Sequence, residues 1–295
     1  MKKALGVDIE DTKIVAAIIY EDGTFKHRID EKTTAENAEV MYETLLSVIH
    51  HVLILSGESW NTLVGIGLGV PGKVNVKEGV AVYQNNIPWS NFPLVARLKQ
   101  DFPGVVVKID NDVKVAAYAE YRLLALDSED MFGYVTVSTG IACANIWNNQ
   151  MIRGSGFSGE IGFVPVPSST GLRAVEKVAA GPAIEQAARE MYQNPTLTTA
   201  EVFDKWQQCE WQAAQIIEQS ALGVALSIYS MICLLDPKVI ILGGNIPVRN
   251  PKYVDLIKIE LKKIIHEEQL HILEQIQISK LESNNGIVGA GFLVM

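Results

Sequence analysis

The stretch Leu5-Gly6-Val7-Asp8-Ile9-Glu10-Asp11-Thr12-Lys13 decides the fold, because it carries the polar turn between two apolar runs. Residues 4–7 and 14–20 have the length and composition of strands, and a second turn signal follows at residues 22–23. These patterns predict a β-hairpin followed by a third strand. Hairpin loops of this type bind phosphate when glycines let backbone amides approach it, yet this loop carries the two acids Glu10 and Asp11. An acidic surface turn is the alternative interpretation.

Residues 1–117 are predicted to form an N-terminal α/β domain. Apolar residues recur at helical spacing over residues 35–56, and a buried strand follows at residues 64–70. Pro71-Gly72 ends that strand, the next strand covers residues 105–109, and a helix opens at Asp112. The first domain therefore combines the hairpin and its third strand with a crossing helix, two further strands and a second helix.

Residues 118–280 are predicted to form a larger C-terminal α/β domain on a similar plan. Two short apolar strands flank the tight turn Ser138-Thr139-Gly140, helices dominate residues 183–235, and a buried strand ends in Gly243-Gly244. The segment from about residue 280 to 295 could pack back onto the first domain. Because the chain has no linker-like tract, we expect the two domains to pack closely, with the binding site in a cleft between them.

The composition excludes several classes of protein. The chain has 295 residues and a formal net charge of −9, which weighs against a nucleic-acid partner. Its three cysteines are widely spaced and form no CxxC pair, as in proteins of the reducing cytoplasm. An acid at position 8 comes too early for a signal peptide, and the longest apolar stretch, residues 221–235, is shorter than the roughly 20 residues of a membrane helix. We therefore expect a cytoplasmic protein that binds neither nucleic acid nor membranes.

Short motifs in a fixed order span nearly the whole chain. They are Gly6-Val7-Asp8, Gly67-Leu68-Gly69-Val70-Pro71-Gly72, Asn111-Asp112, Gly159-Glu160-Ile161-Gly162 and Leu242-Gly243-Gly244. This ordered set resembles the ROK family of repressors, open reading frames and kinases. The resemblance implies an α/β fold of two domains, the actin-like ATPase or ribonuclease-H-like fold, with an interdomain cleft. It also implies phosphorylation of hexoses such as glucose, fructose or N-acetylated hexosamines with ATP and Mg²⁺, and we expect a homodimer.

The sugar side of the expected site centres on Asn111-Asp112. A helix start favours an ionised carboxylate, so Asp112 can accept a proton, and the resemblance makes it the catalytic base and a sugar ligand beside Asn111. A helix N-cap is the alternative role for Asp112. The resemblance also assigns sugar contacts to Glu160 and Asn86. It assigns one to Glu176 as well, although a solvated helical glutamate is the alternative there.

The nucleotide side of the expected site draws on two loops. In the first loop the resemblance assigns phosphate contacts to Asp8, Thr12 and Lys13, with Asp8 also a ligand for Mg²⁺. In the second loop and at the end of the later strand, the residues that the resemblance assigns to the cofactor are Thr139, Gly140, Gly243 and Gly244.

Three departures from the family pattern bear on function. Family kinases have glycines where this chain has Glu10-Asp11, and like charges about 4 Å apart repel by on the order of 4 kcal/mol at an effective dielectric constant of 20. The second loop, residues 138–144, also has fewer glycines than family kinases. Finally, Phe163 replaces the zinc-binding histidine of many members, and residues 164–175 contain neither Cys nor His, so we expect no zinc.

Two functions remain open on this basis. The preferred one is a hexose-binding protein, with a sugar-responsive or regulatory role, in which ATP-dependent phosphorylation is weakened or lost. The alternative is an active hexokinase, such as a glucokinase, fructokinase or N-acetylhexosamine kinase. The altered phosphate loops favour the first function, whereas Asn111, Asp112 and Glu160 favour the second.

Overall fold

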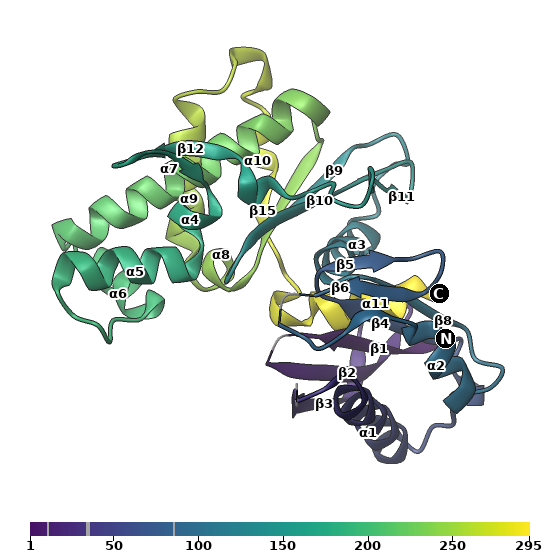
Figure 1. Cartoon of the computed structure of the whole chain (residues 1–295). Coiled ribbons are helices and arrows are strands. Elements are labelled where there is room, and N and C mark those ends of the chain that lie inside the picture. The colour runs from purple at the N-terminus through teal and green to yellow at the C-terminus, as the bar shows by residue number, and fades with distance from the viewer. Residues whose placement is uncertain (11, 34–35, 85) are drawn as a thin grey trace. The chain divides into compact units, whose positions relative to one another are not determined.

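A computed structural model describes residues 1–10, 12–33, 36–84 and 86–295. Asp11, and the expected start of the first helix at residue 35, lie outside the described residues. The chain forms two compact units (Figure 1). Unit 1 comprises Met1–Leu126, Arg153–Phe157 and Ser283–Met295, and unit 2 comprises Asp127–Ile152 and Ser158–Glu282. The division falls after Leu126 rather than at residue 117, because the helix that starts at Asp112 packs within unit 1 along its length.

Unit 1 is a mixed sheet with helices on both faces, and residues 283–295 complete it. Its elements are β1 (Lys3–Ile9), β2 (Lys13–Tyr20), β3 (Phe25–Lys32), α1 (Ala38–Ser56), η1 (Trp60–Thr62), β4 (Ile66–Val70), β5 (Lys73–Asn75), β6 (Val80–Tyr83), β7 (Ser90–Phe92), α2 (Leu94–Asp101), β8 (Val107–Asn111), α3 (Asp112–Leu124) and α11 (Asn285–Leu293), with η4 (Glu282–Asn284) leading into α11.

Unit 2 has a second mixed sheet and most of the helices. Its elements are β9 (Phe132–Val137), β10 (Ile141–Trp147), β11 (Gln150–Met151), η2 (Ile161–Phe163), β12 (Pro165–Ser168), β13 (Gly171–Ala174), α4 (Glu176–Ala179), α5 (Gly181–Tyr192), α6 (Thr199–Gln207), α7 (Trp211–Leu235), β14 (Val239–Gly243), α8 (Asn245–Arg249), α9 (Pro251–Lys262), η3 (Glu267–Gln269), α10 (Ile272–Gln275) and β15 (Ile276–Ile278).

The two main sheets have the same topology. The strand order is β3-β2-β1-β4-β8 in unit 1 and β11-β10-β9-β14-β15 in unit 2. In each sheet the first three strands are antiparallel and the last two run parallel to the third. The repeated plan predicted from the sequence is therefore present in the backbone pairing. The three-residue strands β5 and β7, which form a small separate sheet with β6, carry no comparable sequence signal.

Large and small side chains alternate along β1 and β4, so the two faces of the unit 1 sheet differ. Successive side chains of a strand point to opposite faces. The large side chains of both strands, such as Leu5 and Leu68, join the core cluster that includes α1 and α2. The opposite face carries Gly6 and Gly67, and a Cβ at Gly67 would come within 1.8 Å of the Ala290 carbonyl oxygen. Glycine on this face lets α11 approach the sheet backbone closely, and Asp8 lies on the same face.

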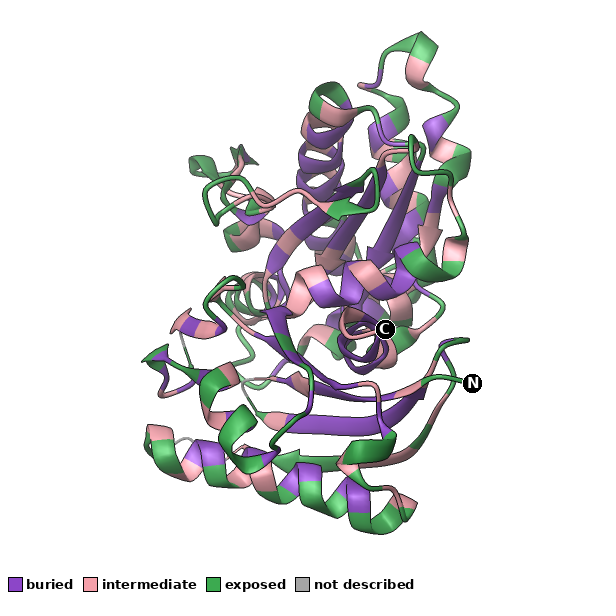
Figure 2. Cartoon of the chain, turned by 90° about the vertical axis from the view of Figure 1, so that its right-hand side faces the viewer, coloured by how far each residue is buried: buried purple, intermediate pink, exposed green. Residues whose placement is uncertain are grey.

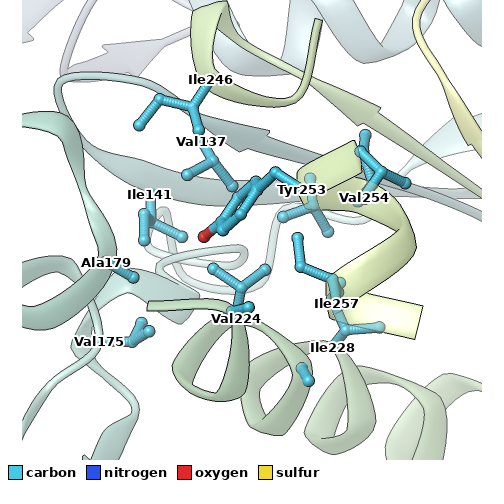
Figure 3. Close-up of a cluster of buried hydrophobic side chains, with 14 of the residues drawn as sticks. Val137, Ile141, Val175, Ala179, Val224, Ile228, Ile246, Tyr253, Val254 and Ile257 are labelled. Atoms are coloured by element: carbon cyan, nitrogen blue, oxygen red, sulfur yellow. The ribbon is translucent and has the colours of Figure 1, made fainter. Parts of the chain in front are cut away.

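The core of unit 2 forms around α7 and α9. Figure 3 shows Tyr253 surrounded by apolar side chains from β9, β10, α7 and α9. The Tyr253 hydroxyl lies 2.6 Å from Ser220 Oγ, and both residues are fully buried. This hydrogen bond satisfies a polar group that would otherwise be costly in an apolar core.

Figure 2 shows that the central strands of the two main sheets are mostly buried, whereas the helices alternate between buried and exposed positions. The edge strand β3 has no buried residue. By length and composition alone, α1 and α7 could cross a membrane, with mean hydropathies of 1.4 and 1.5. Both helices contribute side chains to the cores of their units, including Leu45 of α1 and Val224 of α7. Helices in the core of a globular domain also pass such a test.

Candidate functional site

Asn111 and Asp112 lie at the junction of β8 and α3. Asn111 is the N-cap of the helix, since its backbone is extended and its Oδ1 accepts a hydrogen bond from the Lys114 amide at 3.2 Å. The Asn111 Nδ2 atom donates to Asp112 Oδ1 at 2.7 Å. Asp112 is thus the first helical residue and not the cap. The alternative role considered for Asp112 belongs to Asn111, and the amide of Asn111 also orients the Asp112 carboxylate.

Asp8 lies near the end of β1, beside the same helix start. A Cβ atom added to Gly69 would lie 3.0 Å from Asp8 Oδ1 and 3.5 Å from Asp112 Cα. Gly69 therefore lies between the two acidic residues. The Oδ1 atom of Asp8 is buried and has no hydrogen-bond partner in the part of the chain that the structure describes. Burial raises the pKa of Asp8 well above its ordinary value, and the nearby charges of Glu10 and Asp112 raise it further.

The first loop carries an ion-pair network. The Glu10 amide donates to the Lys13 carbonyl at 2.8 Å and closes the hairpin. Lys13 Nζ lies 3.3 Å from Glu10 Oε1 and 3.7 Å from Asp30 Oδ2. Thr12 is exposed at the tip. Lys13, expected to bind phosphate, therefore has two carboxylates as neighbours within its own unit. Asp11 lies outside the described residues, and only the sequence indicates that it adds a negative charge to this loop.

The residues around Asp8 fit a magnesium ion. Mg²⁺ prefers oxygen ligands and is usually held through one or two carboxylates together with substrate phosphates. Asp8 offers a buried oxygen that lacks a partner among the described residues, and Asp112 lies across Gly69 from it. Asp8 would therefore hold the ion. A bound cation would also oppose the repulsion that raises the pKa of Asp8.

Three segments of unit 2 meet at the turn between β9 and β10. The Ser138 amide donates to the Gly140 carbonyl at 2.9 Å, which makes the turn tight, and Thr139 is exposed at its tip. The Gly181 amide, at the start of α5, donates to the Ser138 carbonyl at 2.8 Å. Gly244 has a φ of +85°, and a Cβ there would come within 2.4 Å of the Val137 carbonyl oxygen. Thr139, Gly140, Gly243 and Gly244 therefore belong to one local cluster.

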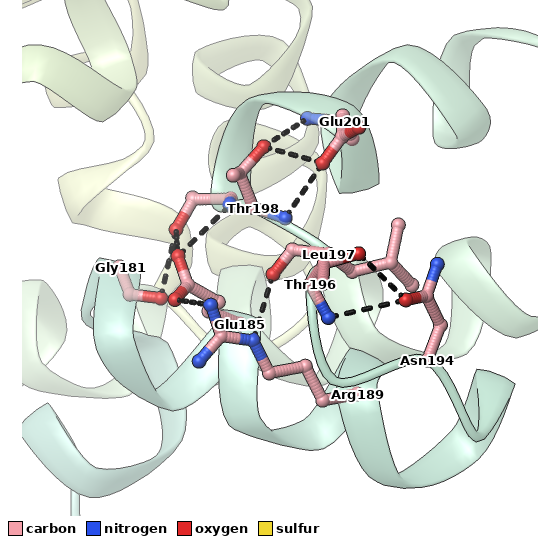
Figure 4. A network of polar contacts seen from close by, with 9 residues as sticks. Gly181, Glu185, Arg189, Asn194, Thr196, Leu197, Thr198 and Glu201 are labelled. Atoms are coloured by element: carbon pink, nitrogen blue, oxygen red, sulfur yellow. Dashed lines mark hydrogen bonds and ion pairs between the residues drawn. The ribbon is translucent and has the colours of Figure 1, made fainter.

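A polar network fixes the start of α5 (Figure 4). Thr199 Oγ1 donates to the Gly181 carbonyl at 3.0 Å, and Arg189 Nε donates to the Leu197 carbonyl at 2.9 Å. Thr198 and Glu201 form a capping box at the start of α6. These bonds tie α5 to the segment that starts α6, and the Gly181–Ser138 hydrogen bond holds the N-terminus of α5 beside the Ser138-Thr139-Gly140 turn. The positive end of a helix dipole at that place favours an anion.

The other expected sugar ligands are distributed between the units. Glu176 Oε2 accepts a hydrogen bond from the Ile141 amide at 3.2 Å and lies against Gly140, next to the phosphate turn of unit 2. Glu160 is exposed at the N-cap of η2, and Asn86 is exposed in unit 1. Near Asn86, Trp89 is buried in the core of unit 1.

A family model described as the ROK family matches residues 4–295. The chain belongs to the ROK family. It is 33% identical over 259 residues to the N-acetylmannosamine kinase of Yersinia pseudotuberculosis, covering 83% of this chain and 84% of that protein. It is 25% identical over 318 aligned positions to the glucokinase of Halalkalibacterium halodurans, covering 98% of this chain and 94% of that protein.

Solved structures agree with this assignment. The ROK hexokinase of Thermus thermophilus superposes with a TM-score of 0.81 at 28% identity, covering 98% of this chain and 96% of that one. The expected fold class is confirmed, because ROK sugar kinases have the two-domain actin-like ATPase fold. Within this ROK protein, unit 1 brings together Asp8, Asn111 and Asp112, and unit 2 brings together Thr139, Gly140, Gly244 and Glu176.

The sequence interpretation missed an ion pair in this ROK protein. Arg153 reaches the Asp110 carboxylate with both terminal nitrogens, at 2.7 and 2.5 Å. The Asp110 side chain is only 3% exposed, whereas that of Arg153 is 41% exposed. The pair anchors the glycine-rich segment 153–156 to the strand that ends in Asn111. The sequence offered one signal, the arginine at the start of the glycine-rich stretch 153–156, but this pattern does not show that Asp110 is its ion-pair partner.

Proposed function

We propose that this ROK protein binds a hexose or hexose derivative and that its ATP-dependent phosphorylation of that sugar is weakened or lost. The observation that supports sugar chemistry best is the junction at β8 and α3. There Asn111 caps the helix and orients Asp112, while Asp8 lies on the other side of Gly69. The proposed proton acceptor and the carboxylate proposed to hold Mg²⁺ therefore lie close together within unit 1.

Asp112 is the proposed catalytic base. It would accept the proton of the attacking sugar hydroxyl, and the hydrogen bond from Asn111 fixes the direction of its carboxylate. ATP with Mg²⁺ supplies the phosphoryl group and neutralises part of its charge when bound. Glu160 and Glu176 of unit 2 are proposed to supply further contacts to sugar hydroxyls.

Weakened transfer is proposed because of the charges in the first loop. Glu10 places a carboxylate where family kinases have a glycine, and it raises the pKa of the nearby Asp8. Lys13 is shared between Glu10 and Asp30, so less of its charge is available to a phosphate. Both effects oppose the binding of a polyphosphate anion.

An active hexokinase is the second candidate. The intact Asn111-Asp112 arrangement favours it, and so do the names glucokinase and N-acetylmannosamine kinase among the relatives. In this case Glu10 would be tolerated because Lys13 and Mg²⁺ offset its charge.

A coupled assay with ATP and Mg²⁺ over a panel of hexoses and amino sugars separates the two candidates. We expect turnover below the roughly 1–100 s⁻¹ of ordinary kinases, and any residual turnover to fall by about 10²–10⁴-fold in Asp112→Asn. Glu10→Gln should tighten MgATP binding by about tenfold in calorimetry, whereas the matched control Glu31→Gln, an exposed acid on β3, should not. Ordinary turnover in the unmodified protein would establish the second candidate.

A further inference from the structure

A cavity beside Asn111 is not explained by the functions proposed above. It has a volume of about 480 Å³, and its walls come from the β5–β6 hairpin, from the start of α3 and from residues 153–156. All of these segments belong to unit 1, so its shape depends on that unit alone. A cavity of this size lies in the range of small-molecule sites.

The charge of this cavity contrasts with that of the chain. Its walls include four cations, Lys73, Lys77, Lys114 and Arg153, and two acids, Glu78 and Asp110, for a formal charge of +2 in a chain of net charge −9. Arg153 and Asp110 pair with each other, and Glu78 accepts a hydrogen bond from Asn75 at 2.8 Å. Among the described residues, the three lysines have no ion-pair partner within 4.0 Å. Their charge is therefore available to a ligand.

Two of the lysines are held in place by the fold. The Lys114 amide donates to the N-cap Asn111, which fixes its position in the first turn of α3. Lys73 Nζ lies 5.3 Å from the centre of the Phe157 ring, within the range of a cation–π contact. The lysines thus come from separate elements that converge on one cavity.

The cavity adjoins the proposed catalytic base and not the first phosphate loop. Asn111 and Gly72 both line it, and Asn111 Nδ2 donates to the Gly72 carbonyl at 3.1 Å as well as to Asp112. By contrast, neither Asp8 nor Lys13 lines the cavity. An anion held here would therefore be separate from a phosphate bound at the β1–β2 loop.

We propose that the acceptor sugar carries an anionic group, a carboxylate or a phosphate monoester, on the part of the molecule away from the hydroxyl that is phosphorylated. That group occupies the cavity and pairs with Lys73, Lys77 and Lys114. The inference rests on the proposed function, because it assigns the substrate class of the site that Asn111 and Asp112 form.

Calorimetric titration with matched sugars tests the inference without requiring turnover. N-acetylmuramic acid is compared with N-acetylglucosamine for the carboxylate, and glucose 1-phosphate with methyl α-glucoside for the phosphate; all four keep the hydroxyl on C6. We expect the anionic member of at least one pair to bind about tenfold tighter at low salt, as two or three partly exposed ion pairs would give. This preference should shrink as the salt concentration rises.

Variants connect that preference to the cavity. In Lys77→Gln/Lys114→Gln the preference should fall below about threefold while the affinity for the neutral sugar is kept, and Lys99→Gln, an exposed lysine of α2 outside the cavity, should retain it. Equal affinity within both pairs, no binding of either anionic probe, or a preference unchanged in the double variant would overturn the inference. Binding of a neutral hexose without any preference for the anionic sugars would overturn it while sparing the proposed function. Tight anion binding without turnover of any sugar would retain the anion site and argue for the loss of phosphorylation.

Discussion

The carboxylate of Asp8 lies directly against Gly286, so that a Cβ atom added to this glycine would come within 1.9 Å of Asp8 Oδ2. Gly286 is in the first turn of α11, and Asp8 is near the end of β1. The position of the acid expected to bind Mg²⁺ therefore depends on a glycine far away in the sequence. The small residues Gly286, Ala290 and Gly291 of α11 allow this close approach of helix and sheet.

Gly286→Ala should displace Asp8. A methyl group cannot share the space of the carboxylate, so we expect weaker binding of MgATP and a loss of about 1–3 kcal/mol in the free energy of unfolding. Calorimetry and urea denaturation measure the two effects. Gly104→Ala is the control for MgATP binding, since a Cβ atom at this position meets nothing within 4 Å. The φ of Gly104 is +84°, so the control variant carries backbone strain of its own in the stability measurement. Unaltered MgATP binding in Gly286→Ala would show that Asp8 does not contribute to the nucleotide site.

Asp8→Asn should stabilise the protein in a pH-dependent way. The folded state raises the pKa of Asp8 above the ordinary value of 3.8, so the folded protein binds this proton more tightly than the unfolded chain. Its contribution to stability is therefore full at low pH and is lost as the pH rises through the folded pKa. Asparagine removes that loss, and we expect a gain on the order of 1 kcal/mol at pH 7.5.

The same substitution should have little effect on stability near pH 4, where the carboxyl group is already protonated. Thermal unfolding of both proteins across this pH range measures the difference. MgATP binding should be lost in Asp8→Asn at every pH. A stabilisation of equal size at both ends of the range would rule out the charge of Asp8 as its cause.

Arg153→Gln should destabilise unit 1. The buried Asp110 carboxylate would lose its ion-pair partner and keep the hydrogen bond from the Asn111 amide, and breaking such a pair costs about 3 kcal/mol. The double variant Asp110→Asn/Arg153→Gln should recover part of this loss, because no unpaired charge remains. Urea denaturation of the single and double variants gives the coupling. A double variant less stable than Arg153→Gln would mean that Asp110 has another essential contact.

Tyr253→Phe should lower the stability of unit 2 by about 1–2 kcal/mol through loss of the buried hydrogen bond to Ser220. The ring stays in place, so sugar binding should not change. Tyr229→Phe on α7 is the control, since this tyrosine is only half-buried and the described residues offer its hydroxyl no partner. Similar losses in both variants would indicate a general effect of removing a hydroxyl group.

Local patterns carried most of the fold prediction. The hairpin of β1 and β2, the turn at Ser138-Thr139-Gly140 and the start of α3 depend on strand alternation, turn residues and a helix cap. All of these act within a few positions of the chain. The sequence therefore located Asn111-Asp112 at a strand-to-helix junction, and only the division of roles between cap and first helical residue needed the structure.

Contacts between distant segments could not be predicted in this way. Arg153 and Asp110 are 43 positions apart, and Asp8 meets Gly286 from the other end of the chain. Neither contact leaves a periodic signal. The same holds for Glu176, whose hydrogen bond to the Ile141 amide places it beside the second loop. Such pairs form because the fold brings their elements together, and the local patterns of a single sequence do not predict which distant residues meet.

The return of α11 to unit 1 has a consequence for biosynthesis. Domains usually fold in the order in which the ribosome makes them. Here the glycine face of β1 and β4 stays uncovered until residues 285–293 emerge, after all of unit 2 has been translated. Unit 2 can thus finish folding before unit 1. A nascent chain paused before α11 would expose an open sheet face to chaperones, and the pocket of Asp8 would close only after residues 285–293 have emerged.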